Sequence, residues 1–368
     1  LTETEQPQVV VQAPGTEETH NELPKRIGRT VTGTFALPLF LKGKGEPGSP
    51  MTYDKDGTTP KATGTTYQAG FTCMLTNAQL GNELGGKARA VVYGHGLLGS
   101  RDEVAGNDLG ANAASGNQMY CATDWLGMST QDIGYATEAL GDLSKFPAMA
   151  DRMQQGILAQ LVLARAIIDP RSLPQLPQFR NKDGSVSYFT DEVFFDGNSQ
   201  GAIMGAAATA VATDWKRATL GVPGMNYSTL LQRSTDWATY AAVMDPAYPS
   251  DADRQLVFGL LQMLWDRGEA GGYVQHLTSN PYPKTPEHQV IFAVAFGDHQ
   301  VAPVTAENMA RMLKIPFHEP SLADGRDPRE EPLWGLDPIT DYPADGSALF
   351  YWDSGALAPP PGNVSPTM

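Results

Sequence analysis

The stretch from Val193 to Gly201, Val-Phe-Phe-Asp-Gly-Asn-Ser-Gln-Gly, decides how we interpret the fold of this chain. Its first three residues form a short apolar run before Asp196, which is typical of a strand buried on both faces of a sheet. Its last five residues form the pattern Gly-x-Ser-x-Gly, and the mainly small residues 202–210 that follow predict a closely packed helix. The stretch therefore predicts a strand, a sharp turn at Ser199 and a helix.

The two glycines of this pattern have a steric explanation. A serine at a sharp turn between strand and helix lies in strained backbone, so the residues two positions away must lack side chains. Its hydroxyl then projects above the sheet at the N-terminus of the helix, where the helix dipole favours developing negative charge. We therefore interpret Ser199 as a nucleophile rather than as an ordinary turn serine.

Short apolar runs and helical patterns alternate on both sides of this stretch, which predicts an α/β fold with a mostly parallel central sheet and helices on both faces. Further strands are expected at residues 88–93, 118–123, 218–222, 290–296 and 348–352, and helices at 147–168 and 303–314. Two more strands, at 32–41 and 67–75, precede them, and residues 226–277 predict two or three helices without a strand.

Two other segments follow expected strands and carry groups suited to catalysis. His95-Gly96-Leu97-Leu98-Gly99 follows residues 88–93, and backbone N–H groups of Leu97 and Gln200 would be donors to an oxyanion. We expect the His95 side chain to support this loop rather than to act as a base. Asp298 follows residues 290–296, where an acid can orient an imidazole.

These residues together resemble the α/β-hydrolase superfamily, and within it the bacterial esterases and lipases. The resemblance covers roughly residues 88–353. It implies that Ser199 is the nucleophile, Asp298 the triad acid, and Leu97 and Gln200 the oxyanion donors. It also implies three parts: an N-terminal arm with edge strands at 1–80, a hydrolase core at 81–225 and 288–368, and a helical cap inserted at 226–287.

The catalytic histidine is the member of the triad that this sequence does not place directly. The family has it after the final strand, but no histidine follows residue 352 in this chain. Three alternatives stay open: a histidine beyond Met368, His318 in the segment after the helix at 303–314, or another of the six histidines.

Charge and composition exclude several classes of function. The 26 basic and 41 acidic residues give a net charge of −15, which argues against a nucleic-acid binder or a protein that docks on anionic membranes. The sequence has no run of about 18 apolar residues, so it predicts no transmembrane helix. The two cysteines, Cys73 and Cys121, are consistent with one disulfide or with two free thiols. Scarce Lys and Arg and ends that look processed favour a secreted or periplasmic protein.

We therefore expect a serine hydrolase that cleaves carboxylic esters through an acyl-enzyme, without cofactor or metal. Its substrate would be a small-molecule, lipid or polymer ester. A polyester depolymerase, thioesterase or peptidase on the same fold is the first alternative, because the fold does not fix the leaving group. A catalytically inactive, hydrolase-like binding protein is the second. The sequence does not indicate an oligomeric state.

Overall fold

The computed structural model describes residues 9–11, 27–76 and 87–358 of the chain. Their strands are β1 (Val9–Val11), β2 (Ile27–Pro38), β3 (Thr66–Thr76), β4 (Ala88–Gly94), β5 (Gln118–Thr123), β6 (Tyr188–Asn198), β7 (Arg217–Gly221), β8 (Gln289–Phe296), β9 (Phe317–His318), β10 (Pro338–Ile339) and β11 (Ala348–Asp353). Their α-helices are α2 (Asn107–Gly116), α3 (Ile133–Gly141), α4 (Phe146–Ile168), α5 (Gln200–Ala210), α6 (Tyr227–Leu230), α7 (Trp237–Ala247), α8 (Asp251–Trp265) and α9 (Pro303–Leu313).

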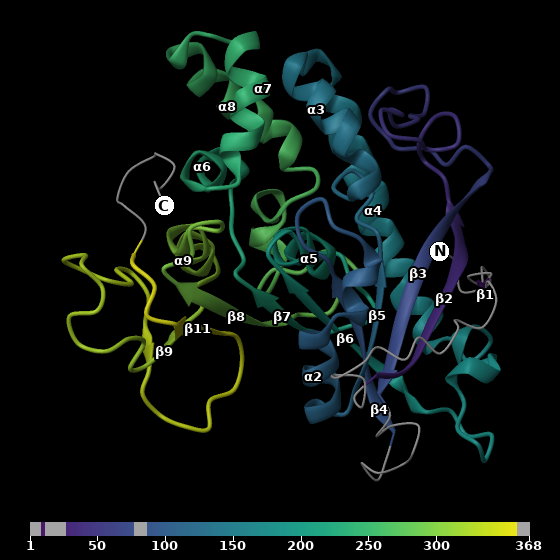
Figure 1. Cartoon of the computed structure of the whole chain (residues 1–368). Coiled ribbons are helices and arrows are strands. Elements are labelled where there is room, and N and C mark those ends of the chain that lie inside the picture. The colour runs from purple at the N-terminus through teal and green to yellow at the C-terminus, as the bar shows by residue number, and fades with distance from the viewer. Residues whose placement is uncertain (1–8, 12–26, 77–86, 359–368) are drawn as a thin grey trace.

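The described strands form one sheet in the order β1-β2-β3-β5-β4-β6-β7-β8-β11-β9-β10 (Figure 1). β2 and β3 pair antiparallel, and β3 pairs antiparallel with β5. From β5 to β10 every neighbouring pair is parallel. The predicted mostly parallel sheet with an N-terminal β extension is therefore confirmed, and the strands of that extension continue the main sheet at one edge.

Helices cover both faces of the sheet, as predicted, but they do so unequally. Helices α4, α5 and α9 pack over the larger core, to which β8 contributes Phe292 and β11 contributes Leu349, both fully buried. Helix α2 lies on the other face over a smaller core with β4 and β5. Because side chains alternate along a strand, Ile291 and Trp352 point to this second face, and they are 42% and 68% exposed.

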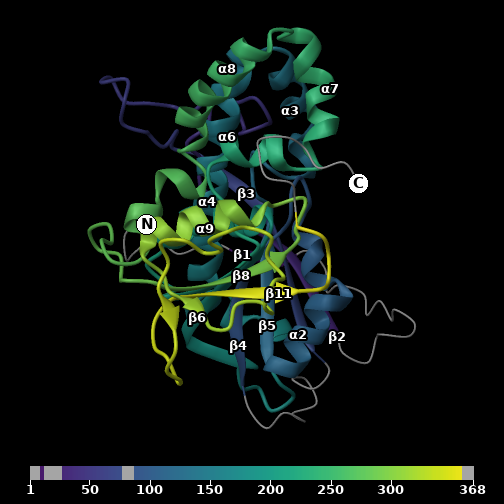
Figure 2. The same ribbon diagram turned by 90° about the vertical axis from the view of Figure 1, so that its left-hand side faces the viewer.

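The segment between β7 and β8 holds helices α6, α7 and α8 and no strand, as expected for residues 226–277. These helices stand above the sheet beside α3, and Figures 1 and 2 show the group from two directions. Below, we call residues 226–287 the cap; its limits remain a prediction. The cap thus lies over the edge of the sheet from which the loops after the strands emerge.

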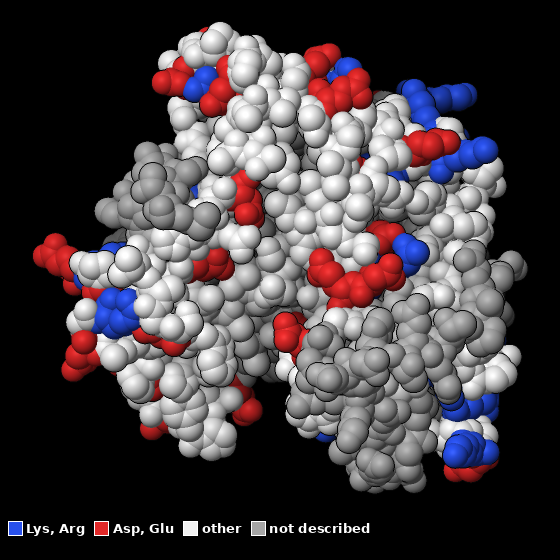
Figure 3. Space-filling view, viewed as in Figure 1, with Lys and Arg blue, Asp and Glu red and all other residues white. Residues whose placement is uncertain are grey.

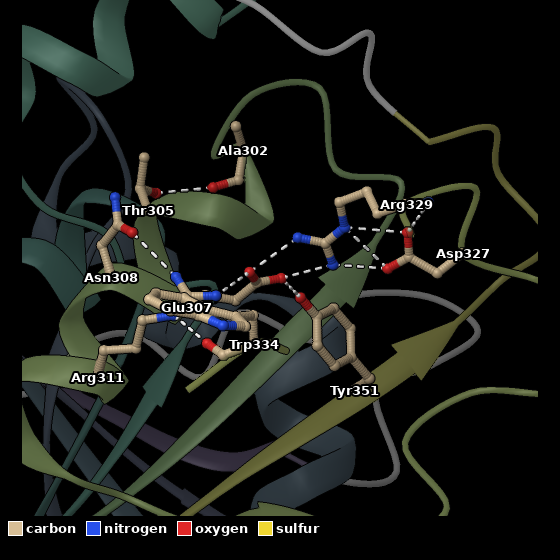
Figure 4. A network of polar contacts seen from close by, with 9 residues as sticks. All are labelled: Ala302, Thr305, Glu307, Asn308, Arg311, Asp327, Arg329, Trp334 and Tyr351. Atoms are coloured by element: carbon tan, nitrogen blue, oxygen red, sulfur yellow. Dashed lines mark hydrogen bonds and ion pairs between the residues drawn. The ribbon is translucent and has the colours of Figure 1, made fainter. Parts of the chain in front are cut away.

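A buried carboxylate connects α9 to the end of the sheet. Glu307 on α9 accepts hydrogen bonds from both terminal nitrogens of Arg329, each at 2.8 Å, and from the Tyr351 hydroxyl on β11 at 2.5 Å (Figure 4). Arg311 on the same helix donates a further bond at 3.1 Å. Charge-assisted, two-pronged bonds of this kind fix geometry strongly. They hold the connection between β9 and β10 against α9 and β11.

A disulfide connects the N-terminal strands to the parallel part of the sheet. Cys73 on β3 lies opposite Cys121 on β5 in the antiparallel pair, and their Cα atoms are 4.0 Å apart. The sequence left bonded and free thiols open, and the structure has the bonded form. The bridge spans a sequence separation of 48 residues.

We expect the Cys73→Ala, Cys121→Ala double variant to lose about 4 kcal/mol of unfolding free energy, because the bridge removes loop-closure entropy from the unfolded chain. Denaturant unfolding would measure this loss. Wild-type protein in reductant should match the variant, and equal stability of the oxidised wild type and the variant would contradict the expectation.

Candidate active site

Ser199 forms the turn between the end of β6 and the start of α5. Its φ of 58° and ψ of −124° are backbone angles that residues with a side chain rarely adopt. The residue is neither fully buried nor fully exposed. It therefore lies at the carboxyl edge of the sheet and at the N-terminus of a helix, where the helix dipole favours negative charge.

The glycines around Ser199 are required by contacts between backbones. A Cβ added to Gly201 would lie 1.9 Å from the carbonyl oxygen of Gly94 at the end of β4. A Cβ added to Gly197 would lie 2.3 Å from the carbonyl oxygen of Gly201. The start of α5 thus rests directly on the ends of β4 and β6, which is the steric reason inferred from the sequence.

The His95 ring supports the loop that follows β4. The Trp125 backbone N–H donates to Nε2 of His95 at 2.8 Å, so the proton of the neutral ring is on Nδ1, which donates to the Gly96 carbonyl at 2.8 Å. Burial lowers the pKa of His95, which keeps the ring neutral. Both nitrogens are therefore occupied in holding this loop, and the supporting role expected for His95 agrees with this geometry.

The two expected oxyanion donors come from neighbouring strands. Gly94 pairs with Gly197 where β4 and β6 run parallel, so the loop with Leu97 and the turn with Gln200 leave the sheet side by side. Gln200 is the first residue of α5, and the first N–H groups of a helix have no partner within it. The donor roles of Leu97 and Gln200 remain predictions.

Asp298 lies in the loop after β8, two strands from β6 and at the same edge, which is a lateral separation of about 10 Å. One of its oxygens accepts from the backbone N–H groups of Gln300 at 2.7 Å and Val301 at 2.9 Å. Burial raises the pKa of Asp298, and these two hydrogen bonds oppose the rise.

The strand order therefore brings together a strained serine on a central strand, the loop that carries Leu97 on the next strand, and an acid two strands away. A strand, a sharp Gly-x-Ser-x-Gly turn and a helix in this setting match the geometry expected of a nucleophile elbow, and the role of Ser199 remains a prediction. The mostly parallel sheet with helices on both faces agrees with the α/β-hydrolase fold that the sequence resemblance implies.

Comparisons with solved structures find other proteins with similar folds. An acetyl xylan esterase from a Thermoanaerobacterium species is 11% identical, with a TM-score of 0.49 over 97% of this chain and 85% of that one. An acetyl xylan esterase from a Paenibacillus species is 12% identical, with a TM-score of 0.47 over 95% and 84%. An S-formylglutathione hydrolase from Agrobacterium tumefaciens is 12% identical, with a TM-score of 0.40 over 89% of each chain.

These likenesses concern the fold alone. No family model matches the sequence of this chain. No curated protein matches it either.

His318, one of the three alternatives for the catalytic base, lies on a strand distant from the one that ends at Ser199. Its strand β9 is four positions from β6 in the sheet, or about 19 Å. Its Nδ1 faces the Pro320 carbonyl at 3.3 Å, and its ring packs against Tyr342 and Phe350. The sequence missed this because the order of β9 and β11 in the sheet cannot be read from their order in the chain.

The other described histidines have backbone partners. His276, His288 and His299 face backbone carbonyls, and His299 contacts that of Leu357 at 3.1 Å. Within the described residues, then, no histidine is hydrogen-bonded to Ser199 or Asp298. A base beyond Met368 is not tested by the structure and remains a prediction.

An apolar pocket of about 60 Å³ lies between the loop after β4 and the cap. It is lined by Leu97, Leu98, Met128, Ala136, Leu140, Phe146, Met149, Tyr227, Leu231, Trp237, Tyr240 and Trp265. The sequence motif after β4 contains Leu97 and Leu98 but does not predict that they meet the cap. The residues from α3 and α4 were missed because their meeting with the cap depends on the tertiary fold.

The described residues contain neither a cluster suited to a metal ion nor a helix suited to span a membrane. No group of three or more His, Cys, Asp or Glu side chains in the described ranges could hold a metal ion. None of the helices described is long and apolar enough to cross a lipid bilayer. Figure 3 shows acidic side chains in several groups across the face of the molecule that it presents, with basic ones in smaller groups beside them.

We expect Gly201→Ala to lower the unfolding free energy by about 1–3 kcal/mol or to prevent folding, because its Cβ would overlap the Gly94 carbonyl. Gly259→Ala in α8 is the matched control, since its Cβ would meet no atom within 4 Å. That change should leave stability equal or raise it by up to about 1 kcal/mol. Chemical denaturation would measure both, and a stable, native Gly201→Ala protein would contradict the packing argument.

Proposed function

We propose that this protein is a serine hydrolase that cleaves carboxylic esters through an acyl-enzyme. The observation that carries the proposal is the strained, partly accessible Ser199 at the N-terminus of α5. Strain of this kind persists where the surrounding structure enforces it, and it is concentrated at functional sites.

The chemistry follows from the positions of the groups. The Ser199 hydroxyl attacks the ester carbonyl carbon while a histidine takes its proton, and Asp298 stabilises the resulting imidazolium. The carbonyl oxygen becomes an oxyanion, to which the N–H groups of Leu97 and Gln200 donate. The bond to the alcohol oxygen breaks, and that oxygen takes the proton from the imidazolium. Water then attacks the acyl-enzyme by the same route and releases the acid.

The pocket suggests which part of the ester is recognised. Its lining is apolar and extends from the oxyanion loop at Leu97 to Trp265 under the cap, so it suits the acyl side of the substrate. At about 60 Å³ it is small beside the roughly 150 Å³ of a cavity that holds benzene. Short acyl groups are therefore the substrates we propose. The net charge of −15 disfavours strongly anionic esters.

The absence of a histidine bonded to Ser199 or Asp298, within the described residues, favours a second candidate. In that case the protein would be a hydrolase-like binding protein whose serine is not activated. A fluorophosphonate probe separates the two candidates, because it labels an activated serine and leaves an inert one unmodified.

We expect Ser199→Ala to lower kcat for p-nitrophenyl acetate by about 10³-fold or more, because it removes the nucleophile. The control is an unchanged melting temperature and circular dichroism spectrum. Labelling by the fluorophosphonate should disappear in the same variant. Retained turnover in a folded Ser199→Ala protein would reject the proposed nucleophile.

His318→Ala should leave kcat/KM for the same ester within about twofold, since β9 lies four strands from β6. His299→Ala is the comparison, because His299 follows Asp298 directly in the loop after β8. A large loss of activity in His318→Ala, at unchanged stability, would contradict the sheet order as a guide to the base.

We also propose that the protein works in an oxidising compartment, outside the cytoplasm. The disulfide between Cys73 and Cys121 supports this, since such bonds are rare in reducing compartments. Intact-mass measurement of the alkylated protein, with and without reductant, tests whether the bond is present in protein from its native source.

A further inference from the structure

The side chain of the residue after the nucleophile is attached to the cap. The Tyr227 hydroxyl, on α6, donates a hydrogen bond to Oε1 of Gln200, the first residue of α5. Gln200 is 2% exposed and Tyr227 4% exposed, so the contact is shielded from water. The Tyr227 ring also packs against that of Trp265 at the end of α8, with ring centres 5.4 Å apart. The residue expected to supply an oxyanion donor is therefore held by a cap side chain.

Tyr227 is held in turn by a buried carboxylate. Glu269 is fully buried, and the backbone N–H of Tyr227 interacts favourably with its carboxylate. Gly271 donates to the carboxylate at 2.9 Å, and Nε2 of Gln262 donates to it as well. Gln262 also accepts from the backbone N–H of Ser228 at 2.9 Å, next to Tyr227. These contacts connect α8, the turn after it and α6 into one polar cluster.

The ionisable groups facing Glu269 do not stabilise its charge. Asp266 at the end of α8 repels it, and the Tyr227 hydroxyl on α6 is neutral because burial raises its pKa well above the ordinary value. Burial and Asp266 raise the pKa of Glu269 to about 7, although its hydrogen bonds with Gly271, Gln262 and Tyr227 act in the opposite direction. The carboxyl group therefore changes its charge near neutral pH.

We propose that Glu269 and Tyr227 are positioning residues for Ser199 chemistry, and that ionised Glu269 fixes Tyr227 and, through Gln200, the oxyanion donor. An ionised carboxylate only accepts, so it satisfies its donors Gly271 and Gln262 and attracts the backbone N–H of Tyr227. When the carboxyl group is protonated, one of its oxygens carries a hydrogen and becomes a donor, so these N–H groups lose part of their acceptor. Tyr227 then holds Gln200 less firmly. This role rests on the proposed hydrolase function.

The test is the second-order rate at which a fluorophosphonate labels Ser199, measured from pH 5.5 to 8.5. Labelling needs attack by the base-activated serine and stabilisation of the oxyanion, but no hydrolysis of an acyl-enzyme. The rate ratio of wild type to Glu269→Gln should rise from about 1 at pH 5.5 to about 5–10 at pH 8.5, roughly the effect of one hydrogen bond. Taking the ratio cancels the ionisation of the base, which both proteins share.

Tyr227→Phe provides a second variant that keeps the ring and its packing on Trp265. It should label about five- to tenfold more slowly than wild type at pH 8.5, and Glu269→Gln should add no further loss in this background. Tyr351→Phe is its matched control, because it removes a buried hydroxyl from the Glu307 cluster. Asp196→Asn is the control for Glu269→Gln, because Asp196 is a second carboxyl group whose pKa is raised by burial, to about 6. It lies on the α2 face of the sheet.

The possible results separate the two proposals. Wild-type labelling that is unchanged in Glu269→Gln and Tyr227→Phe at every pH would overturn the positioning role alone. A pH-dependent loss of the same size in Asp196→Asn would also overturn it, because the effect would then follow any buried carboxyl group. No labelling of the wild type at any pH would overturn the hydrolase function and this role with it.

Discussion

The contact between the start of α5 and the end of β4 is the constraint on which the rest of the site depends. Gly201 lies so close to the Gly94 carbonyl that no side chain fits between them. The helix can approach the strands this closely only because the backbone turns sharply at Ser199, with φ at 58°. One steric condition thus sets the height of the serine above the sheet, the direction of α5 and the place of its first N–H groups.

The parts of the fold set by local rules could be predicted from the sequence. Runs of adjacent apolar residues predict the strands β4, β5, β8 and β11. The glycines beside Ser199 predict the sharp turn in the same way. Helices α2 and α3 were missed because each has at most ten residues and contains two glycines, which are poor helix formers. Strands β9 and β10 have two residues each, too few to show a pattern.

The parts that depend on long-range packing could not be predicted. Glu269 is an ordinary acidic residue in the sequence, and only the fold shows that it is buried beneath Tyr227. Arg329 and Tyr351, which contact Glu307, belong to two other segments of the chain, so no spacing in the sequence predicts that cluster. The position of His318 depends on β11 lying between β8 and β9, although β11 comes later in the chain.

The cap cluster implies that stability and positioning respond to pH in opposite directions. The pKa of Glu269 is raised in the folded protein, so its contribution to stability is complete below its ordinary value of 4.5. That contribution is lost as the pH rises through about 7. Ionisation therefore costs folding free energy in the same range in which it satisfies the donors around the carboxylate. Such an exchange of stability for site geometry is common in enzymes.

The uneven covering of the sheet affects how the protein behaves in concentrated solution. Ile291 and Trp352 remain exposed on the α2 face, and large exposed apolar groups favour contact between molecules. At pH 7 the net charge of −15 keeps neighbouring copies apart. Acidification removes that repulsion while the apolar surface stays the same, so mildly acidic buffers favour self-association. Slightly alkaline buffers of low ionic strength are accordingly the conditions in which we expect the least self-association.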